Sequence, residues 1–546
     1  MTKNGRAMSR SRGTVSRREF VQTLAVSSAS VFMSGFTRRE PSIPGEIVGA
    51  NSKHGHLLRS QQTMPDITRS ENTNVVIIGG GIAGLAASRS LSKAGVEHHI
   101  LELEAEVGGN ARSGENRVSA FPWGAHYVPV PGKGDTLVTD LFRELGVITG
   151  TDSQEAPIYN EKYLCYAPEE RLFIHGRWQE GLLPQVGVAE HERKEYQRFF
   201  KQMATFRSAV GRDGKRAFAI PVDQSSRDER FLGYDRVTMD AFLQDNGYSS
   251  RYLQWYINYC LRDDYGTPSS QVSAWAGIHY FASRASFGAN VDEYAVLTWP
   301  EGNGWIVKEM KARTKGEIRC NALVLDIHEH EEKVSVTYLD TASMTSSELI
   351  CNYVIYAAPR FTAPYVIRRL REQKGTYLPS FEYAPWMVAS ITLSGLPEDS
   401  AQGTAWDNVI FESDSLGYVS ATHQQLRGNA REHVWSYYLP LSHAEPSVAR
   451  KEASEHSAEE WKNMVVRDLS RAHRDIRHKI SRIDIWLWGH GMIRPRPNFI
   501  WGSDRREAQA PLGRVHFAHS DMSGISIFEE AFYRGTVAAD EVLKRI

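Results

Sequence analysis

The sequence is poor in cysteine, lacks long apolar runs and carries almost no net charge. Only four of its 546 residues are cysteines, and none stands in a Cys-x-x-Cys pair, so the sequence predicts no zinc site. Beyond a short opening stretch, no apolar run approaches the length of a membrane span. The formal net charge of −1 is far from the basic balance of nucleic-acid-binding proteins, so we expect no nucleic-acid partner. The length allows two or three domains.

One histidine-rich stretch, "HEHEEK" from His328, invites a metal interpretation. It lies between two strand-like runs, "NALVLDI" and "VSVTYL". A solvated hairpin tip is the better interpretation, and we expect no bound metal.

The first 40 residues differ from the rest in charge. They hold eight Lys or Arg and two acidic residues, which leaves about −7 on the remainder. Arg17 and Arg18 precede a short apolar stretch over 21–36 that serines interrupt. A basic region followed by an apolar one is the layout of an export signal. The Ser-Arg-Arg-x-Phe-Val order resembles a twin-arginine signal; a basic tail that holds Arg-Arg by chance is the alternative.

This interpretation predicts a signal over 1–36 and a linker over 37–73. The twin-arginine export machinery is then a partner. The protein is then expected in the periplasm, or on the outer face of the cytoplasmic membrane, of a bacterium.

A glycine motif follows the first buried strand. Residues 75–78 form a short apolar, β-branched run typical of a parallel strand. Gly79, Gly81 and Gly84 follow in Gly-x-Gly-x-x-Gly spacing, and a helical pattern comes next. Such glycines permit a tight turn, a close approach of a pyrophosphate and close helix packing. Glu102, 21 residues after Gly81, can hold ribose hydroxyls. The unit therefore predicts a dinucleotide site, although its spacing alone does not separate NAD from FAD.

The residues beyond the motif carry a family resemblance. "LELEAEVGG" leads into "NARSG" and then "FPWGAHYVP", while "ELICNYVIYAAPRF" and "GRVHFAHSDMSGISIFEEAFYRGTVAADEVL" come later. In this order they resemble the flavin amine oxidase superfamily, which includes monoamine and polyamine oxidases and phytoene desaturases. The resemblance implies FAD as the cofactor.

The glycine motif and the resemblance together assign a set of cofactor-binding residues. They are Gly79, Gly81, Ala83, Gly84, Glu102, Gly109, Arg112, Gly124, Ala125, His126, Val324, Asp521 and Ala531. The sequence departs from the family at three points. Asn110 follows the Gly-Gly pair where the family has Arg, so Arg112 is expected to take the phosphate contact. His519 and Glu530 stand where the family has Gly.

The expected fold class is α/β, with a discontinuous Rossmann-type FAD-binding domain and an inserted mixed α+β substrate domain. The FAD-binding domain is expected over 74–130, 300–365 and 500–546, and the substrate domain over 131–299 and 366–499. Helical spacing is present at 137–145, 189–210, 239–263 and 270–283. "PEGNGWIV" lacks a third glycine and is predicted as a turn into a helix at 305–313 rather than a second dinucleotide site.

One dinucleotide site implies that electrons enter the flavin from an organic substrate, such as an amine, by hydride transfer to flavin N5. A carotenoid desaturase or isomerase acting on C–C bonds is the second enzyme hypothesis. A flavoprotein that serves as an assembly factor or electron-transfer partner is the third. Oxygen, a quinone or a redox protein is the expected electron acceptor, and no catalytic residue is assigned.

The C-terminal half lacks a lysine that the resemblance leads us to expect, and the roles of its aromatic residues and of two arginines stay open. Amine oxidases commonly carry a lysine near flavin N5, and the matching run over 384–395 has none. Aromatic residues there either line a pocket or pack in the core; they are Trp386, Trp435, Tyr437, Tyr438, Trp486, Trp488 and Trp501. Arg494 and Arg496 are predicted either to bind a carboxylate or to form an exposed basic loop.

Overall fold

The computed structural model describes residues 42–59, 65–373, 380–400, 404–425 and 431–546. The predicted signal at 1–36 lies outside these ranges. Two units are distinguished, 1–42 and 43–546, and everything below concerns the second. Within the described ranges, no helix combines the length and apolarity that a membrane crossing requires.

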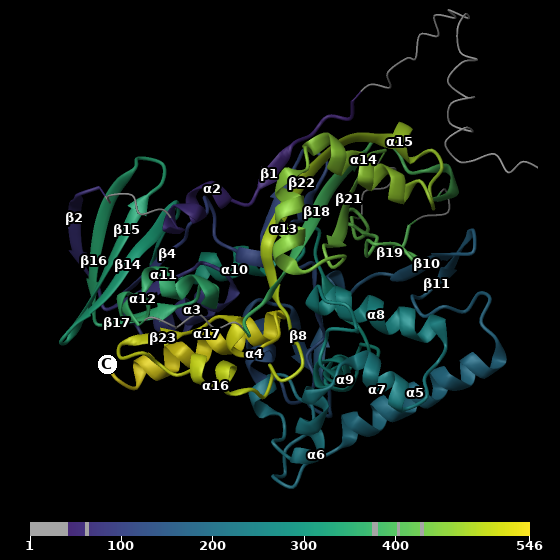
Figure 1. The fold of residues 1–546 in the computed structure, drawn as a ribbon, viewed down its shortest axis with the longest axis horizontal. Coiled ribbons are helices and arrows are strands. Elements are labelled where there is room, and N and C mark those ends of the chain that lie inside the picture. The colour runs from purple at the N-terminus through teal and green to yellow at the C-terminus, as the bar shows by residue number, and fades with distance from the viewer. Residues whose placement is uncertain (1–41, 60–64, 374–379, 401–403, 426–430) are drawn as a thin grey trace, which may run out of the picture. The chain divides into compact units, whose positions relative to one another are not determined.

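A five-stranded parallel sheet carries the glycine motif. Its order is β13 (Glu317–Arg319), β4 (His98–Leu101), β3 (Val75–Ile78), β17 (Tyr353–Tyr356) and β23 (Val515–Phe517). β3 and β4 are buried along their whole length, as continuous apolar runs in a parallel sheet should be. α3 (Ile82–Lys93) and α17 (Phe528–Leu543) pack together beside it (Figure 1).

An antiparallel meander lies next to this sheet. It comprises β14 (Ala322–His330), β15 (Lys333–Asp340) and β16 (Thr345–Cys351), with β2 (Ile67–Asn72) added parallel to β16. The pairing of His330 with Lys333 places a tight turn at Glu331 and Glu332, which confirms the predicted hairpin. No group of three metal-ligating side chains is found among the residues that the structure describes.

A second, eight-stranded sheet forms the floor of the cavity described below. Its order is β1 (Ile47–Gly49), β22 (Ile480–Ile493), β18 (Tyr383–Leu393), β21 (His433–Pro440), β20 (Tyr418–Ser420), β19 (Asp407–Ile410), β10 (Glu170–Ile174) and β11 (Arg177–Glu180). Alternate residues of β18 belong to different cores, with Trp386 and Val388 in one and Met387 and Ala389 in the other. The second core also contains residues of α13 (Pro446–Glu455) and α14 (Ala458–Leu469). Successive side chains of β18 therefore point to opposite faces of the sheet and enter different cores.

The helices expected from the sequence pattern are present, except that one expected helix is divided into two. α4 (Thr136–Glu144), α5 (Glu190–Ser208), α9 (Ala274–Ala282) and α10 (Gly304–Arg313) occupy expected ranges. The range 239–263 is instead two helices, α7 (Met239–Asp245) and α8 (Arg251–Tyr265). Gly247, at φ +66°, and the Ser250 N-cap, whose hydroxyl accepts the Leu253 N–H, separate them.

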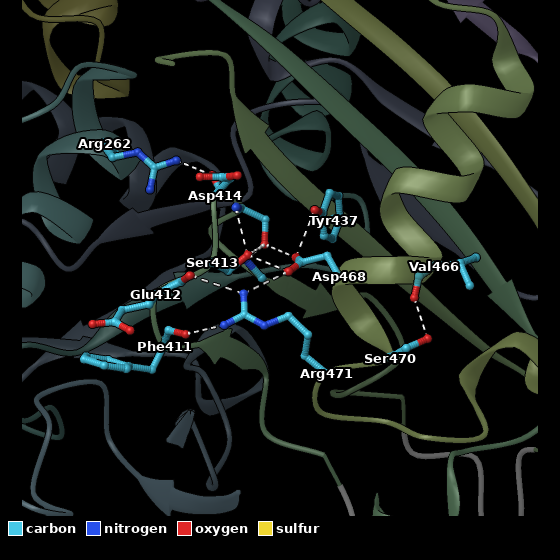
Figure 2. Close-up of polar contacts among 12 residues, drawn as sticks. Arg262, Phe411, Glu412, Ser413, Asp414, Tyr437, Val466, Asp468, Ser470 and Arg471 are labelled. Atoms are coloured by element: carbon cyan, nitrogen blue, oxygen red, sulfur yellow. Dashed lines mark hydrogen bonds and ion pairs between the residues drawn. The ribbon is translucent and has the colours of Figure 1, made fainter. Parts of the chain in front are cut away.

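Helix α8 is fixed to the large sheet by a turn at 411–417 (Figure 2). The Arg262 guanidinium donates to Asp414 O. Across the turn, the Asp468 carboxylate of α14 accepts hydrogen bonds from Ser413 at 2.7 Å and from Tyr437 at 3.0 Å. Arg262 directly precedes Asp263, so these contacts also position the cavity acid described below.

Residues 43–72, expected as part of a linker, hold four short elements instead. They are β1, α2 (Ser52–Gly55), the 3₁₀ helix η1 (His56–Arg59) and β2. β1 pairs with β22, and β2 pairs with β16. Each element has three to six residues, which is too short for a hydrophobic period to be visible in the sequence.

Candidate functional site

The glycine motif forms a phosphate-binding loop between β3 and α3. Gly79 adopts φ +100°, and a Cβ there would lie 2.9 Å from Ala357 O. A Cβ on Gly84 would collide with Gly79 O. Gly81, the N-cap of α3, has no side-chain cap, so the first helical N–H groups keep no side-chain partner there. The loop thus has the backbone that a pyrophosphate requires.

Facing Gly81 is the second glycine pair. A Cβ on Gly81 would lie 3.9 Å from the Gly109 Cα, and Gly108 N donates to Gly80 O at 2.9 Å. The next residue, Asn110, donates its side-chain amide to Gly491 O. These contacts join the phosphate loop to β22 of the large sheet.

Glu102 directly follows β4, and its carboxylate accepts hydrogen bonds from the backbone of two loops. Its Oε2 accepts Gly80 N at 2.7 Å, and its Oε1 accepts Glu104 N at 2.9 Å. Burial raises the pKa of this carboxyl. Each oxygen retains a second lone pair for a ribose hydroxyl. Arg112 pairs with Glu104 at 3.3 Å, donates to Glu106 O and lies 5.3 Å from the Trp486 ring, so its phosphate contact stays a prediction.

Asp521 follows β23 and has one oxygen without a donor. Its Oδ2 accepts the Tyr383 hydroxyl at 2.6 Å and Arg360 N at 2.9 Å. The Oδ1 atom is 3.0 Å from His519 Nδ1, but that nitrogen accepts the Asp521 N–H, and Oδ1 makes no hydrogen bond. An orphaned, fully buried carboxylate oxygen fits the predicted contact with the ribityl hydroxyls of FAD.

The other predicted residues have distinct locations. Val324 is buried on β14, and Ala83 is buried on α3. Ala531 lies on α17, one residue after Glu530. The Glu530 carboxylate accepts Val222 N at 2.6 Å, so this departure from the family glycine fastens α17 to the segment 217–226.

A cavity of about 140 Å³ is lined by Asn110, by residues of the large sheet and α8, and by the start of α17. Gly124, Ala125 and His126, all predicted from sequence, line it, as does Asn110. His126 lies 4.6 Å from the Tyr438 ring, and burial lowers its pKa to about 4. Its imidazole is therefore neutral at pH 7.

Three of the seven aromatic residues named from the sequence line this cavity. They are Trp386, Tyr438 and Trp488, whereas Trp435, Tyr437, Trp486 and Trp501 belong to cores or pack against them. The Tyr438 hydroxyl donates to Gly124 O at 2.9 Å, and Trp488 Nε1 donates to Trp123 O at 2.7 Å. These bonds hold the aromatic walls against the predicted flavin strand.

Helix α8 brings two adjacent acids into the cavity, and sequence reasoning missed both. Arg284 Nη2 forms an ion pair with Asp264 and donates to both carboxylate oxygens, at 2.7 and 2.9 Å. Asp263 receives only the Tyr127 hydroxyl, at 3.3 Å. Burial, followed by repulsion from Asp264, raises the pKa of Asp263 to about 7. Among the described residues, Asp263 therefore has no ion-pair partner, and neither has Glu529 of α17, which also lines the cavity.

Two further acids lie close to Asp263. Glu170 of β10 and Asp407 of β19 are paired in register. Burial and then Glu169 raise the pKa of Glu170 to about 7; burial, then Glu170 and Asp263, raise the pKa of Asp407. Ionisation of any one of these three carboxyl groups therefore disfavours ionisation of the other two, and a cation bound beside them would offset that repulsion.

No free cation balances these acids. Among the described cavity-lining residues, Arg284 is the sole permanent cation, and it is paired with Asp264. β18, which has no lysine, presents Val388 to the cavity. Arg494 and Arg496 both pair with Glu382, Arg494 at 2.7 Å, and Arg494 is buried. Arg496, by contrast, is exposed, and the carboxylate that both arginines bind is that of Glu382 in the protein itself.

The parallel sheet, its phosphate loop and the adjoining cavity define a dinucleotide-dependent oxidoreductase. The chain belongs to the family of flavin containing amine oxidoreductases, whose model matches residues 82–543. It is an FAD-dependent oxidoreductase. The glycine loop, Glu102 and the orphaned Asp521 oxygen fit that cofactor.

Solved structures share the fold. Putrescine oxidase, in a wild-type structure bound to putrescine, matches with a TM-score of 0.63 and 16% identity over 87% of this chain and 100% of its own. Cyclohexylamine oxidase from Brevibacterium oxydans matches with a TM-score of 0.61 and 14% identity over 87% and 99%. A fatty acid isomerase from P. acnes, producing CLA, matches with a TM-score of 0.57 and 16% identity over 86% and 98%. No curated protein sequence matches the chain.

Proposed function

We propose that this protein oxidises an amine that carries a second positive charge, as a diamine or polyamine does. The observation that carries the proposal is the carboxyl group of Asp263 in the cavity, which forms no ion pair among the described residues. Glu170 and Asp407 are acidic neighbours that act on it or on each other electrostatically. One ammonium group binds at these acids while the other end of the substrate lies beside the Gly124–His126 strand. FAD, when bound, supplies the hydride acceptor.

The walls suit such a substrate. Trp386, Tyr438 and Trp488 offer apolar and aromatic surface to a methylene chain. The neutral His126 imidazole adds no positive charge that would repel an amine. The putrescine complex of the structurally similar putrescine oxidase supports a diamine substrate of this kind.

A C–C bond desaturase or isomerase is the second enzyme hypothesis, and one structurally similar protein is a fatty acid isomerase. The acids argue against it for this chain. A fatty acid carboxylate would be repelled by ionised Asp263, and an apolar polyene would leave this cavity carboxyl without a counter-charge. The assembly or electron-transfer hypothesis differs in needing a partner protein rather than a small substrate.

The electron acceptor and the location are part of the same proposal. Oxygen reduction passes through an anion, and the cavity offers no free cation to stabilise it. A quinone or a redox protein in the cell envelope is therefore the proposed acceptor. Export by the twin-arginine route, proposed from Arg17 and Arg18, carries the folded protein with FAD in place.

Anaerobic bleaching of the flavin absorbance tests the proposal. Putrescine and longer diamines should bleach the flavin faster than cyclohexylamine, and fatty acids and polyenes should not bleach it. Bleaching by a fatty acid or a polyene alone would favour the isomerase or desaturase class. Bleaching only after a partner protein is added would favour electron transfer.

A further inference from the structure

Glu529, the second residue of α17, lies where two cavities meet. It lines the cavity described above and also a second, smaller cavity of about 20 Å³. Pro129 and Arg284 line both cavities as well, so these three residues form the wall that the cavities share. Among the acids that the structure describes, Glu529 is the one that lines both.

The carboxyl group of Glu529 has no partner in the protein. The residue is 4% exposed, and its Oε2 atom accepts no hydrogen bond from the described residues. Arg284, the cation on the same wall, is bonded to Asp264 instead. Buried polar atoms without a partner are rare in folded proteins. This oxygen is therefore available to a group that enters the cavities.

The second cavity leads from Glu529 toward the protein surface. Asp135, Arg216 and Ser283 supply polar groups to its lining, and the exposed Gly134 lies on the lining too. The cavity has room for about one water molecule, which needs roughly 10–15 Å³. Such a water would have the carboxyl groups of Glu529 and Asp135 among its neighbours.

Helix packing holds Asp135 beside this space. Asp135 is the N-cap of α4, and its Oδ1 accepts the Val138 N–H at 3.2 Å. α4 packs against the start of α17, with the Phe142 and Phe528 rings 6.2 Å apart (Figure 1). Asp135 is also buried, and burial raises its pKa to about 6. The second cavity therefore has one acid at its inner wall and another on the way to the surface.

The protonation of Glu529 depends on what the first cavity holds. Burial raises its pKa to about 8, the charge of Arg284 lowers it, and the charges of Asp135 and Asp264 raise it. The carboxyl is therefore neutral at pH 7 when no further cation lies beside it. A neighbouring ammonium group favours the ionised form. Binding of a cationic amine thus expels the carboxyl proton and leaves a carboxylate facing the ammonium group.

We propose that Glu529 accepts the proton that an amine must lose before it is oxidised, and that the second cavity passes this proton to Asp135 and to solvent. This inference rests on the amine substrate proposed above. One N–H bond of the ammonium group breaks and one O–H bond forms on Glu529. The electron pair stays on nitrogen, so both groups become neutral. Asp263 lines the first cavity alone and holds the second ammonium group.

The limiting rate of anaerobic flavin reduction by saturating putrescine tests the role of Glu529. Glu529→Gln is compared with wild type and with Asp540→Asn, an exposed change near the other end of α17. A general base contributes about 10²–10⁴-fold, so Glu529→Gln should react about a hundredfold more slowly at pH 7. The loss should shrink to about tenfold or less near pH 10.4, where about half of the amine is already neutral. Asp540→Asn should match wild type at both pH values.

Asp135→Asn tests the path of the proton. Asn is as good an N-cap as Asp, so α4 should keep its start while the titrating group is lost. At pH 7 the limiting rate of this variant should lie between those of wild type and Glu529→Gln. The flavin absorbance of every variant is first compared with that of wild type, so that a loss of FAD is not mistaken for a slower reaction.

Infrared difference spectra follow the Glu529 proton without any substrate. The C=O stretch of the neutral carboxyl should be present at pH 6, disappear as pH rises through about 8, and be missing from Glu529→Gln. An unchanged spectrum in Glu529→Gln would overturn the assignment of this proton to Glu529.

The kinetic outcomes separate this role from the proposed function. Equal rates of wild type and Glu529→Gln at pH 7, or the same loss at both pH values, would overturn the role of Glu529 as proton acceptor. A rate of Asp135→Asn equal to that of wild type would overturn the path through the second cavity. Failure of every amine to reduce the wild-type flavin would instead overturn the proposed function, and this role with it.

Discussion

The Tyr127 hydroxyl donates a hydrogen bond of 3.3 Å to the Asp263 carboxylate. Tyr127 begins β7 (Tyr127–Pro129), directly after the predicted flavin-side residues Ala125 and His126, whereas Asp263 belongs to α8. The bond therefore joins the flavin side of the cavity to the helix that carries its acids. It also orients a cavity carboxyl that forms no ion pair among the described residues.

Replacing Asp263 by Asn should weaken catalysis on dicationic amines. An interaction with a charged group contributes about 1.5–3 kcal/mol, so kcat/KM for putrescine should fall about tenfold to a hundredfold, while a monoamine should lose less. Steady-state kinetics with both substrates measures this. Asp245→Asn, an exposed change on α7, is the matched control. Equal losses for both substrates would mean that Asp263 does not recognise the second charge.

The pH dependence should follow the acids. The pKa of Asp263, raised to about 7 by burial and Asp264, leaves this carboxyl neutral below that pH. Attraction of an ammonium group therefore grows as pH rises through 7, and kcat/KM for a diamine should rise in the same range. Glu170, Asp264, Arg284 and Tyr127 also act on this group, so the profile reports coupled titrations. In Asp263→Asn the rise of kcat/KM with pH should be smaller. An unchanged pH profile would mean that another group than Asp263 causes the rise.

Val388→Lys should speed reaction with oxygen. Val388 is the β18 side chain that lines the cavity beside Trp386, on the strand where amine oxidases commonly carry a lysine. A cation there would stabilise the superoxide-like anion, and 1.4 kcal/mol is worth a factor of ten in rate. We expect slow reoxidation of the wild type by oxygen, faster reoxidation by a soluble quinone, and at least tenfold faster oxygen reaction of the variant. Stopped-flow absorbance measures all three rates. Fast reaction of the reduced wild-type flavin with oxygen would mean that oxygen is the electron acceptor and that the protein is a true oxidase.

Gly81→Val should abolish FAD binding while leaving a folded chain. A Cβ at this position meets only the Gly109 Cα, at 3.9 Å, so the larger side chain enters the space kept for the pyrophosphate. The variant should purify colourless with a normal circular dichroism spectrum. Gly150→Val is the control, because nothing lies within 4 Å of a Cβ on this exposed strand residue. A yellow Gly81→Val protein would contradict the phosphate site.

Changing Arg17 and Arg18 together to Lys should retain a folded, yellow protein in the cytoplasm. The twin-arginine route depends on this pair and carries folded proteins, so FAD loading should be unaffected. Cell fractionation with flavin absorbance measures both location and cofactor content. Normal export of the double variant would refute the signal assignment.

Local motifs were predictable from the sequence, and contacts between distant segments were not. The Gly79–Glu102 unit is a strand, a loop and a helix in immediate succession, so residues close together in the sequence determine its local structure. The role of Asp263 depends on where α8 packs, which no local pattern specifies. Tyr437 and Tyr438 are adjacent and equally aromatic, yet only Tyr438 lines the cavity, because the orientation of β21 decides which face each residue takes.

The parallel sheet is assembled from both ends of the chain. β3 begins at residue 75, whereas β23 and Asp521 come only at 515–521. A ribosome must therefore synthesise nearly the whole chain before the cofactor has a complete site. We expect chains that stop short of β23 to be colourless, so that flavin absorbance would report full-length synthesis as well as folding.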